Sequence, residues 1–186
     1  LARVLASQRA SLKRSVVFAA FSAEEEGLLG SKHYLSAPSF PLENTVAMIN
    51  MDMIGRMKDD RVIVGGSGTS PLWKEMLPRL KPANLDLKFQ DDGYGPSDHA
   101  SFYAKDIPVL FFFTGVHQDY HRPSDDADKI NLPGANKVLE LVLETAQALS
   151  QQDARPTFSK AKDSKESHGR GEFRVYLGTI PDYGED

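Results

Sequence analysis

The chain has 186 residues, of which 26 are acidic and 22 are basic, and its formal net charge at pH 7 is -4. This balance leaves no basic field for nucleic acid, and no apolar run approaches the roughly 20 residues that span a bilayer. The sequence therefore argues against nucleic acid as a partner and against a membrane-spanning segment. Because the chain has no cysteine, any metal site must be built from His, Asp and Glu.

Strand-like apolar runs alternate with amphipathic helical stretches from residue 1 to about residue 150. The predicted helices cover residues 1–12, 27–37, 70–80, 98–105 and 134–151. The predicted strands cover residues 15–23, 44–53, 61–66, 85–90 and 107–115. Several of these strands are apolar throughout, which is typical of strands buried on both faces of a sheet. The alternation predicts an α/β domain, a three-layer sandwich whose mostly parallel or mixed central sheet is flanked by helices.

The composition changes near the end of the chain. Residues 151–171 are polar, charged and rich in Gly and Ser, which predicts a linker. Residues 172–186 begin with a strand-like run that is too short to bury a core, so we interpret them as the first strand of a second, truncated domain. The first residues read as a helix already in progress. We therefore expect residues 1–150 to be the later part of a domain whose N-terminal part is missing.

Four candidate site residues lie at or beyond the ends of predicted strands, where ligand sites form in open α/β sheets. They are Glu24, Glu25, Asp52 and His121. Oxygen and nitrogen donors of these types suit hydrolytic zinc, and one of two adjacent glutamates can bind the metal while the other takes a proton from water. The alternative for the glutamates is that they are favourable charges at a helix N-terminus. A buried carboxylate at Asp52, in an apolar strand, must be paired or bound to a metal.

Other polar residues have simpler interpretations. Asp98 and His99, in "PSDHA", are typical of a helix cap, although His99 could also be a ligand. His117 and Asp119 form an H-x-D pattern that we interpret as loop residues.

Four motifs, in this order, carry a family resemblance: "AEEEGLLGS", "NMDMIGR", "GYGPSDHASF" and "DYHRPSDD". From about residue 14 to residue 150 the chain resembles the co-catalytic zinc aminopeptidases of the bacterial leucine aminopeptidase type, to which the glutaminyl cyclases and the transferrin receptor ectodomain are related. The resemblance implies two zinc ions, Glu24 as general acid/base, and Glu25 and His121 as ligands of one ion. It also implies Asp52 as a ligand of the other ion and Tyr94 as a hydrogen-bond donor to the developing oxyanion.

The resemblance further implies that Asp98, His99 and Asp125 support the ligands without binding metal. One departure is large: the family carries an H-x-D motif before its glutamate pair, whose Asp bridges both metals, and nothing before Glu24 matches it. Three of five ligand positions are therefore present, and we expect partial or absent zinc occupancy and an inactive fragment. The segment "FRVYLGTIPDYGED" is similar to the opening strand of a PDZ domain that follows the peptidase domain in some bacterial members.

The sequence thus predicts a metal-dependent aminopeptidase that acts on peptides. A single-zinc acyltransferase of the glutaminyl cyclase kind and a non-catalytic, receptor-like binding module are the alternatives. The family resemblance implies a periplasmic, secreted or cell-envelope location. We also expect that the sheet edge left by the missing N-terminal part could support self-association.

Overall fold

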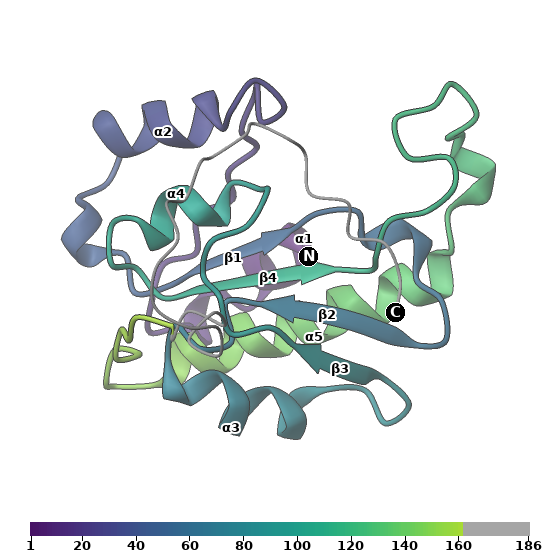
Figure 1. Cartoon of the computed structure of the whole chain (residues 1–186). Helices are drawn as coiled ribbons and strands as arrows, with labels where there is room; N and C mark the ends of the chain where they lie inside the picture. Colours follow the sequence, from purple (N-terminus) through teal and green to yellow (C-terminus); the bar gives the residue numbers. More distant parts are fainter. Residues whose placement is uncertain (162–186) are drawn as a thin grey trace, which may run out of the picture.

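The computed structural model describes residues 1–161 and contains one four-stranded sheet in the order β1-β4-β2-β3 (Figure 1). The strands are β1 (Met48–Met51), β2 (Arg61–Gly65), β3 (Asp86–Phe89) and β4 (Val109–Phe113). β1 runs parallel to β4 and β2 runs parallel to β3, whereas β2 and β4 are antiparallel. The sheet is therefore mixed, as the sequence predicts.

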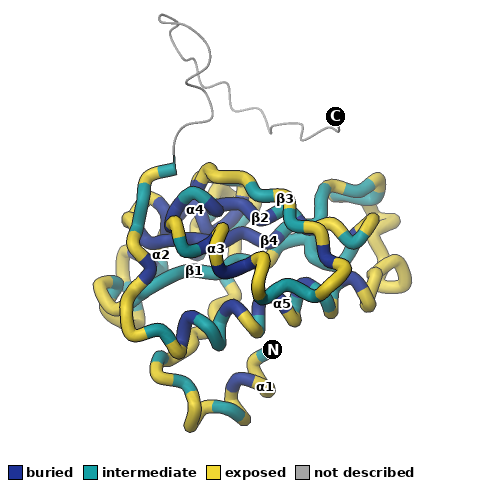
Figure 2. The backbone as a smooth tube through the Cα atoms, turned by 90° about the horizontal axis from the view of Figure 1, so that it is seen from below, coloured by how far each residue is buried: buried dark blue, intermediate teal, exposed yellow. Residues whose placement is uncertain are grey.

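Helices cover both faces of the sheet, which gives the expected three layers (Figure 2). The helices are α1 (Ala2–Ser7), α2 (Leu29–Ser36), α3 (Pro71–Leu80), α4 (His99–Tyr103) and α5 (Leu132–Gln151). Short 3-10 turns lie at η1 (Arg9–Ser11), η2 (Leu42–Asn44), η3 (Ile54–Arg56) and η4 (Ala127–Lys129). α3 and α5 pack on one face, while α2 and α4 pack on the other. Within the described part of the chain, none of the helices has the length and hydropathy needed to cross a bilayer.

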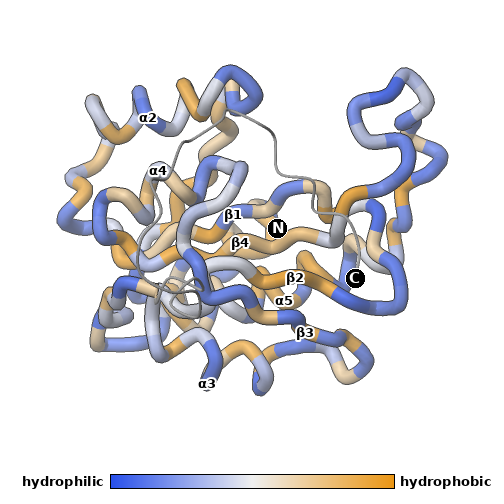
Figure 3. The backbone as a smooth tube through the Cα atoms, in the orientation of Figure 1, coloured by the Kyte–Doolittle hydropathy of each residue, from blue (hydrophilic) through white to orange (hydrophobic). Residues whose placement is uncertain are grey.

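The main core lies between the sheet and the α3–α5 layer. Val138, Leu141, Val142 and Leu149 follow the spacing of a single helix face, so α5 presents one apolar stripe to the sheet. Trp73 of α3 is fully buried against the same core. Burial of side chains of this size stabilises the fold by about 1.5–3 kcal/mol each. The central strands β2 and β4 form the apolar middle of the sheet, which Figure 3 colours orange.

The prediction of a strand at residues 15–23 is wrong. Residues 15–20 have no regular secondary structure, and about half of the surface of Val17 and Phe18 is exposed, at 52% and 51%. A strand needs a neighbour to complete its hydrogen-bond ladder, and in the described residues the sheet ends at β1. The predicted strand at 44–53 is shorter than expected: β1 covers only Met48–Met51, and residues 45–47 have no regular secondary structure.

The described part of the predicted linker packs against the domain. Pro156 is buried, Phe158 packs on Tyr103 with ring centroids 5.7 Å apart, and the N–H of Ser159 donates to the carbonyl of Thr69. The N–H of Ala161 donates to the Tyr103 hydroxyl. Residues 152–161 therefore form a strap over the α4 side of the sheet. The predicted PDZ-like strand at 172–186 lies outside the described residues.

Candidate active site

The parallel pairing of β1 with β4 brings two predicted site segments to one edge of the sheet. Asp52 directly follows β1, and its N–H continues the ladder by donating to the carbonyl of Phe112 at 3.1 Å. His121 lies in the segment between β4 and α5. Because the carboxyl ends of parallel strands lie at the same edge of a sheet, Asp52 and the segment that carries His121 both leave the sheet at that edge.

Glu24 and Glu25 lie in a tight turn before α2. The N–H groups of Gly27 and Leu28 both donate to the carbonyl of Glu24, at 3.0 and 2.8 Å. The turn closes where the N–H of Gly30 donates to the carbonyl of Ser22, and a Cβ at Gly30 would lie 2.4 Å from that oxygen. α2 begins only at Leu29, so the glutamates are not charges of its first turn.

The turn brings Glu25 to His121. The Nε2 atom of His121 lies 2.9 Å from Oε1 of Glu25, and both side chains are more than half exposed. His121 itself has a positive φ of 54°, as does Ala23 before Glu24, and Met53 after Asp52 has a φ of 49°. Positive φ is uncommon for residues other than glycine and is concentrated at functional sites. Strained backbone thus lies at or beside each of the three site segments.

The Glu24 carboxyl carries a raised pKa. Partial burial is the largest cause, and three neighbouring carboxylates raise the pKa further, while His121 lowers it. The three carboxylates are Glu25, Asp52 and Asp98. These interactions also show that the site residues lie close enough to sense one another. A carboxyl whose pKa is raised towards neutrality is suited to give and take protons.

Asp98, the residue before α4, and His99, its first residue, are both buried. Asp98 occupies the N-cap position of α4 but makes no capping hydrogen bond, and its Oδ1 atom is buried without a partner in the described part of the chain. His99 is 1% exposed and stacks on Phe111 with centroids 4.3 Å apart. Its burial lowers the pKa to about 4, so the imidazole is neutral. The Asn50 amide, 3.5 Å from Nδ1 of His99, donates to the Ser97 hydroxyl at 2.7 Å.

Tyr94 lies on the loop before α4 and is 60% exposed. Its ring meets the edge of Tyr103 with centroids 4.7 Å apart. Gly93 allows this approach, because a Cβ there would lie 2.3 Å from the Tyr103 ring. Tyr94 does not line the cavity described next, so the structure places it outside that wall of the site.

A cavity of about 1660 Å³ joins the site residues to an apolar wall. Glu24, Glu25, Asp52, Asp98, His121 and Asp125 contribute to its polar side. Val16, Val17 and Phe18 contribute to its apolar side. Within residues 1–161, however, no three His, Asp or Glu side chains gather closely enough to hold a metal ion. Glu25 and His121 are paired, whereas Asp52 does not lie close enough to them to share one metal ion.

Arg56 is not among the site residues that the sequence predicts. Its guanidinium donates to Asp119 at 2.5 Å and to Asp125 at 2.9 Å. Asp119 also accepts from Ser124 and Lys129, and these contacts, with Lys129 as the largest cause, lower its pKa. The Asp119 carboxylate of the H-x-D pattern is therefore already bound by Arg56, Ser124 and Lys129. The one available signal for Arg56 was its place in "NMDMIGR", shortly after Asp52.

The sequence and fold of this chain can be compared with those of known proteins. The sequence profile of Peptidase family M28 matches residues 1–146. The chain belongs to Peptidase family M28. This assignment agrees with the mixed sheet, the flanking helices and the acidic site at the edge of β1 and β4.

Individual members of the family resemble the chain over most of its length. Aminopeptidase YwaD of Bacillus subtilis is 28% identical over 179 residues, which cover 90% of this chain and 39% of that protein. The structure of the LapA aminopeptidase of Legionella pneumophila superposes with a TM-score of 0.68 and 29% identity, over 81% of this chain and 43% of that chain. The structure of BSAP, a zinc aminopeptidase from Bacillus subtilis, gives a TM-score of 0.55 and 28% identity, over 77% of this chain and 38% of that chain. This M28 chain spans about a third to two fifths of the length of the curated relatives it matches.

Proposed function

We propose that the full-length protein is a zinc-dependent aminopeptidase that removes N-terminal residues from peptides. The observation that carries the proposal is geometric: one turn pairs Glu25 with His121 at 2.9 Å, and Glu24 beside it lines the same cavity as Asp52. The membership of family M28 and the resemblance to two aminopeptidase structures support the same reaction.

Glu25 and His121, which are paired at 2.9 Å, would hold one zinc ion, and Asp52, which lies apart from that pair, would hold the other. These residues offer two carboxylates and an imidazole, the donor types that hydrolytic zinc sites use. The buried, unpartnered Oδ1 of Asp98 at the cavity wall supports this fit, because a polar atom in that position needs a partner. When bound, zinc supplies Lewis acidity and lowers the pKa of water. Two ions, as in the family resemblance, remain part of the proposal.

The side chains of this chain would then divide the reaction between them. Glu24 accepts a proton from the attacking water and later donates it to the leaving amine, a role for which its raised pKa is suited. The Tyr94 hydroxyl is the proposed donor to the oxyanion, which requires the exposed Tyr94 side chain to turn toward the cavity. Asp98, His99 and Asp125 support the site from behind.

The Glu24→Gln substitution tests the proposal. We expect peptide hydrolysis by the full-length protein to fall by at least about 100-fold, the usual contribution of a general base, while the zinc content stays unchanged. Glu26→Gln is the matched control, because Glu26 is an exposed neighbour in the same turn. Hydrolysis of leucyl p-nitroanilide and elemental analysis give the two measurements. Near-normal activity of the Glu24 variant would mean that another group is the base.

A companion substitution, His121→Ala, tests the metal ligands. We expect it to lower the zinc content measured by elemental analysis. Unchanged stoichiometry would remove His121 from the ligand set.

The same full-length protein can be used to distinguish the proposed function from two alternative functions. A glutaminyl cyclase-like enzyme would convert N-terminal glutamine to pyroglutamate without releasing an amino acid, and a receptor-like module would bind peptide without either reaction. Mass spectrometry of a peptide that begins with glutamine distinguishes the three outcomes.

The edge of β1 supports a further part of the proposal, self-association. Among residues 1–161, β1 pairs with β4 on one side only, and Met51 on that strand is exposed. Unpaired strand edges are ready to pair with another chain. Light scattering after size-exclusion chromatography should detect a dimer that Met51→Lys weakens. A periplasmic, secreted or cell-envelope location is also proposed, and fractionation of cells that express the protein tests it.

A further inference from the structure

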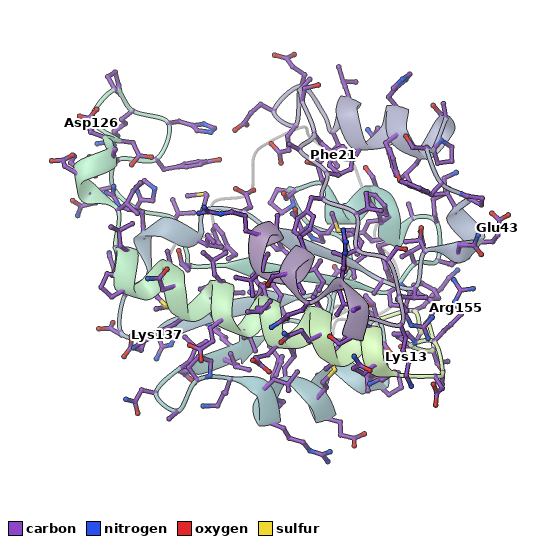
Figure 4. The ribbon with its side chains drawn as sticks, turned by 180° about the vertical axis from the view of Figure 1, so that it is seen from behind. Lys13, Phe21, Glu43, Asp126, Lys137 and Arg155 are labelled. Carbon is purple, nitrogen blue, oxygen red and sulfur yellow. The ribbon has the colours of Figure 1, made fainter. Side chains whose placement is uncertain are left out.

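The loop that carries His121 projects from the body of the protein. Residues 121–130 are all exposed, and Figure 1 shows the segment between β4 and α5 rising away from the sheet. Figure 4 labels Asp126 near the end of this projection. The backbone N–H groups of Tyr120, Arg122, Asp125, Asp126, Lys129 and Ile130 donate to carbonyls of residues 117–127, within the same loop. These bonds shape the loop but do not fix its position relative to the sheet.

Arg56 supplies charged contacts from outside the loop. Its Nη2 atom donates to Oδ2 of Asp119 and its Nη1 atom donates to Oδ1 of Asp125, so one guanidinium holds two points of the loop. The Arg56 side chain is only 16% exposed. Partly buried guanidinium–carboxylate pairs of this kind are stronger and geometrically more specific than exposed ones.

The two anchored carboxylates lie on either side of His121. Asp119 is also bound by Ser124 and Lys129, which makes this part of the loop a connected unit. Asp125 in addition has its Oδ2 atom 3.7 Å from Nε2 of His117. A movement of Arg56 relative to these carboxylates therefore moves the whole stretch from residue 117 to residue 129.

Arg56 also belongs to the segment that carries Asp52. It ends η3, which follows Asp52 and Met53. Both ends of the loop are fixed to this segment: the Thr114 hydroxyl donates to the carbonyl of Met53, and the N–H of Asn131 donates to the carbonyl of Gly55 at 2.8 Å. η3 is thus the common base from which Asp52 and the His121 loop are both placed.

We propose that Arg56 is the positioning residue of His121, and that its two ion pairs hold the loop where His121 meets Glu25. The part of this inference that concerns zinc rests on the proposed function, whereas the part that concerns loop position does not. Arg56 does not touch the reacting atoms. It acts through Asp119 and Asp125.

The first experiment needs no metal. We would measure ¹⁵N relaxation and the His121 ring resonances by NMR in the metal-free protein, for the wild type, Arg56→Gln and Arg56→Lys. We expect lower order parameters across residues 117–128 and a shifted His121 ring signal in Arg56→Gln, with partial recovery in Arg56→Lys. Arg61→Gln is the matched control, because it breaks an exposed Arg–Asp pair between Arg61 of β2 and Asp86 of β3. Unchanged loop order in Arg56→Gln would overturn the proposal.

The second experiment measures zinc binding to the full-length protein by calorimetric titration. We expect Arg56→Gln to weaken binding at least about tenfold, the usual effect of removing a group that orients a ligand, and Arg61→Gln to leave it unchanged. If wild type and Arg56→Gln bind zinc equally, Arg56 does not position the ligand, although the proposed function stands. If the wild type binds no zinc but the loop loses order in Arg56→Gln, the positioning role stands and the zinc assignment fails. Should Arg56→Gln not fold, Asp125→Asn removes one of the two pairs and is read in the same way.

Discussion

The two loops that border the candidate site are held in different ways. The Tyr94 loop leads into α4 and rests on buried groups, since Gly93, Ser97, Asp98 and His99 are all buried and Tyr103 packs against Tyr94. The His121 loop is exposed from residue 121 to residue 130 and is held through charged side chains. One side of the site is thus fixed by packing and the other by ion pairs.

This difference predicts different sensitivities. Packing responds to lost volume and to the burial of charge, and its effects reach the stability of the whole domain. Ion pairs at a surface contribute little to global stability and weaken as salt is added. Substitutions on the Tyr94 side should therefore lower the stability of the whole domain. Substitutions on the His121 side should disturb only the loop.

The largest expected effect is on the packed side. Phe102 of α4 is 5% exposed and lies beside Phe21 and Tyr34. We expect Phe102→Ala to lower the free energy of unfolding by about 3–5 kcal/mol, because it removes a buried ring and leaves a cavity. Urea denaturation followed by circular dichroism measures the change. A loss below about 1 kcal/mol would mean that the α4 layer is not packed as described.

The second effect is a pH dependence at His99. Burial lowers its pKa from 6.5 to about 4, so between these values the unfolded chain binds a proton that the folded chain does not. Stability is therefore greatest above pH 6.5 and falls as the pH drops toward 4. The expected loss from this residue between pH 7 and pH 5 is about 2 kcal/mol. Urea midpoints at the two pH values should differ less in His99→Asn, and an equal difference in both proteins would contradict the assignment.

The smallest effect belongs to the charged side. Lys129→Met removes the contact of Lys129 with Asp119, whose ammonium and carboxylate lie 2.8 Å apart. We expect the global free energy of unfolding to change by less than about 1 kcal/mol. Amide hydrogen exchange should nevertheless become faster in residues 117–130 at low salt. In 1 M NaCl the two proteins should exchange alike, since the Debye length is then about 3 Å. A difference that survives high salt would point to packing instead of charge.

Local patterns in the sequence were sufficient for much of the fold. The helix at 70–80 was predictable because Ser70 caps it and Pro71 begins it, and the side chain of Ser70 does accept from the N–H of Leu72. The strand at 107–115 was predictable because β4 is buried on both faces. Residues 15–23 have the same apolar character, but hydropathy does not tell whether a neighbouring strand is present.

The candidate site, too, could be predicted only in part from local sequence patterns. Glu24 and Glu25 stood out by their place after the apolar run at 15–23, which does not form a strand, and His121 stood out by its place beyond β4. The burial of His99 and the role of Arg56 depend on how distant segments pack, which no local pattern records. The H-x-D of His117 and Asp119 shows the converse: its spacing suits a metal, but Arg56, Ser124 and Lys129 already bind the Asp119 carboxylate.

The strap at residues 152–161 changes where the domain boundary should be drawn in practice. Composition alone places the boundary near residue 151, yet Phe158 and Ala161 both contact Tyr103, the residue on which Tyr94 rests. A protein cut at residue 151 would lose the donor to the Tyr103 hydroxyl and the Ser159 hydrogen bond to the Thr69 carbonyl. Expression boundaries, tags and fusion points belong after residue 161, because the strap is part of the domain's own packing.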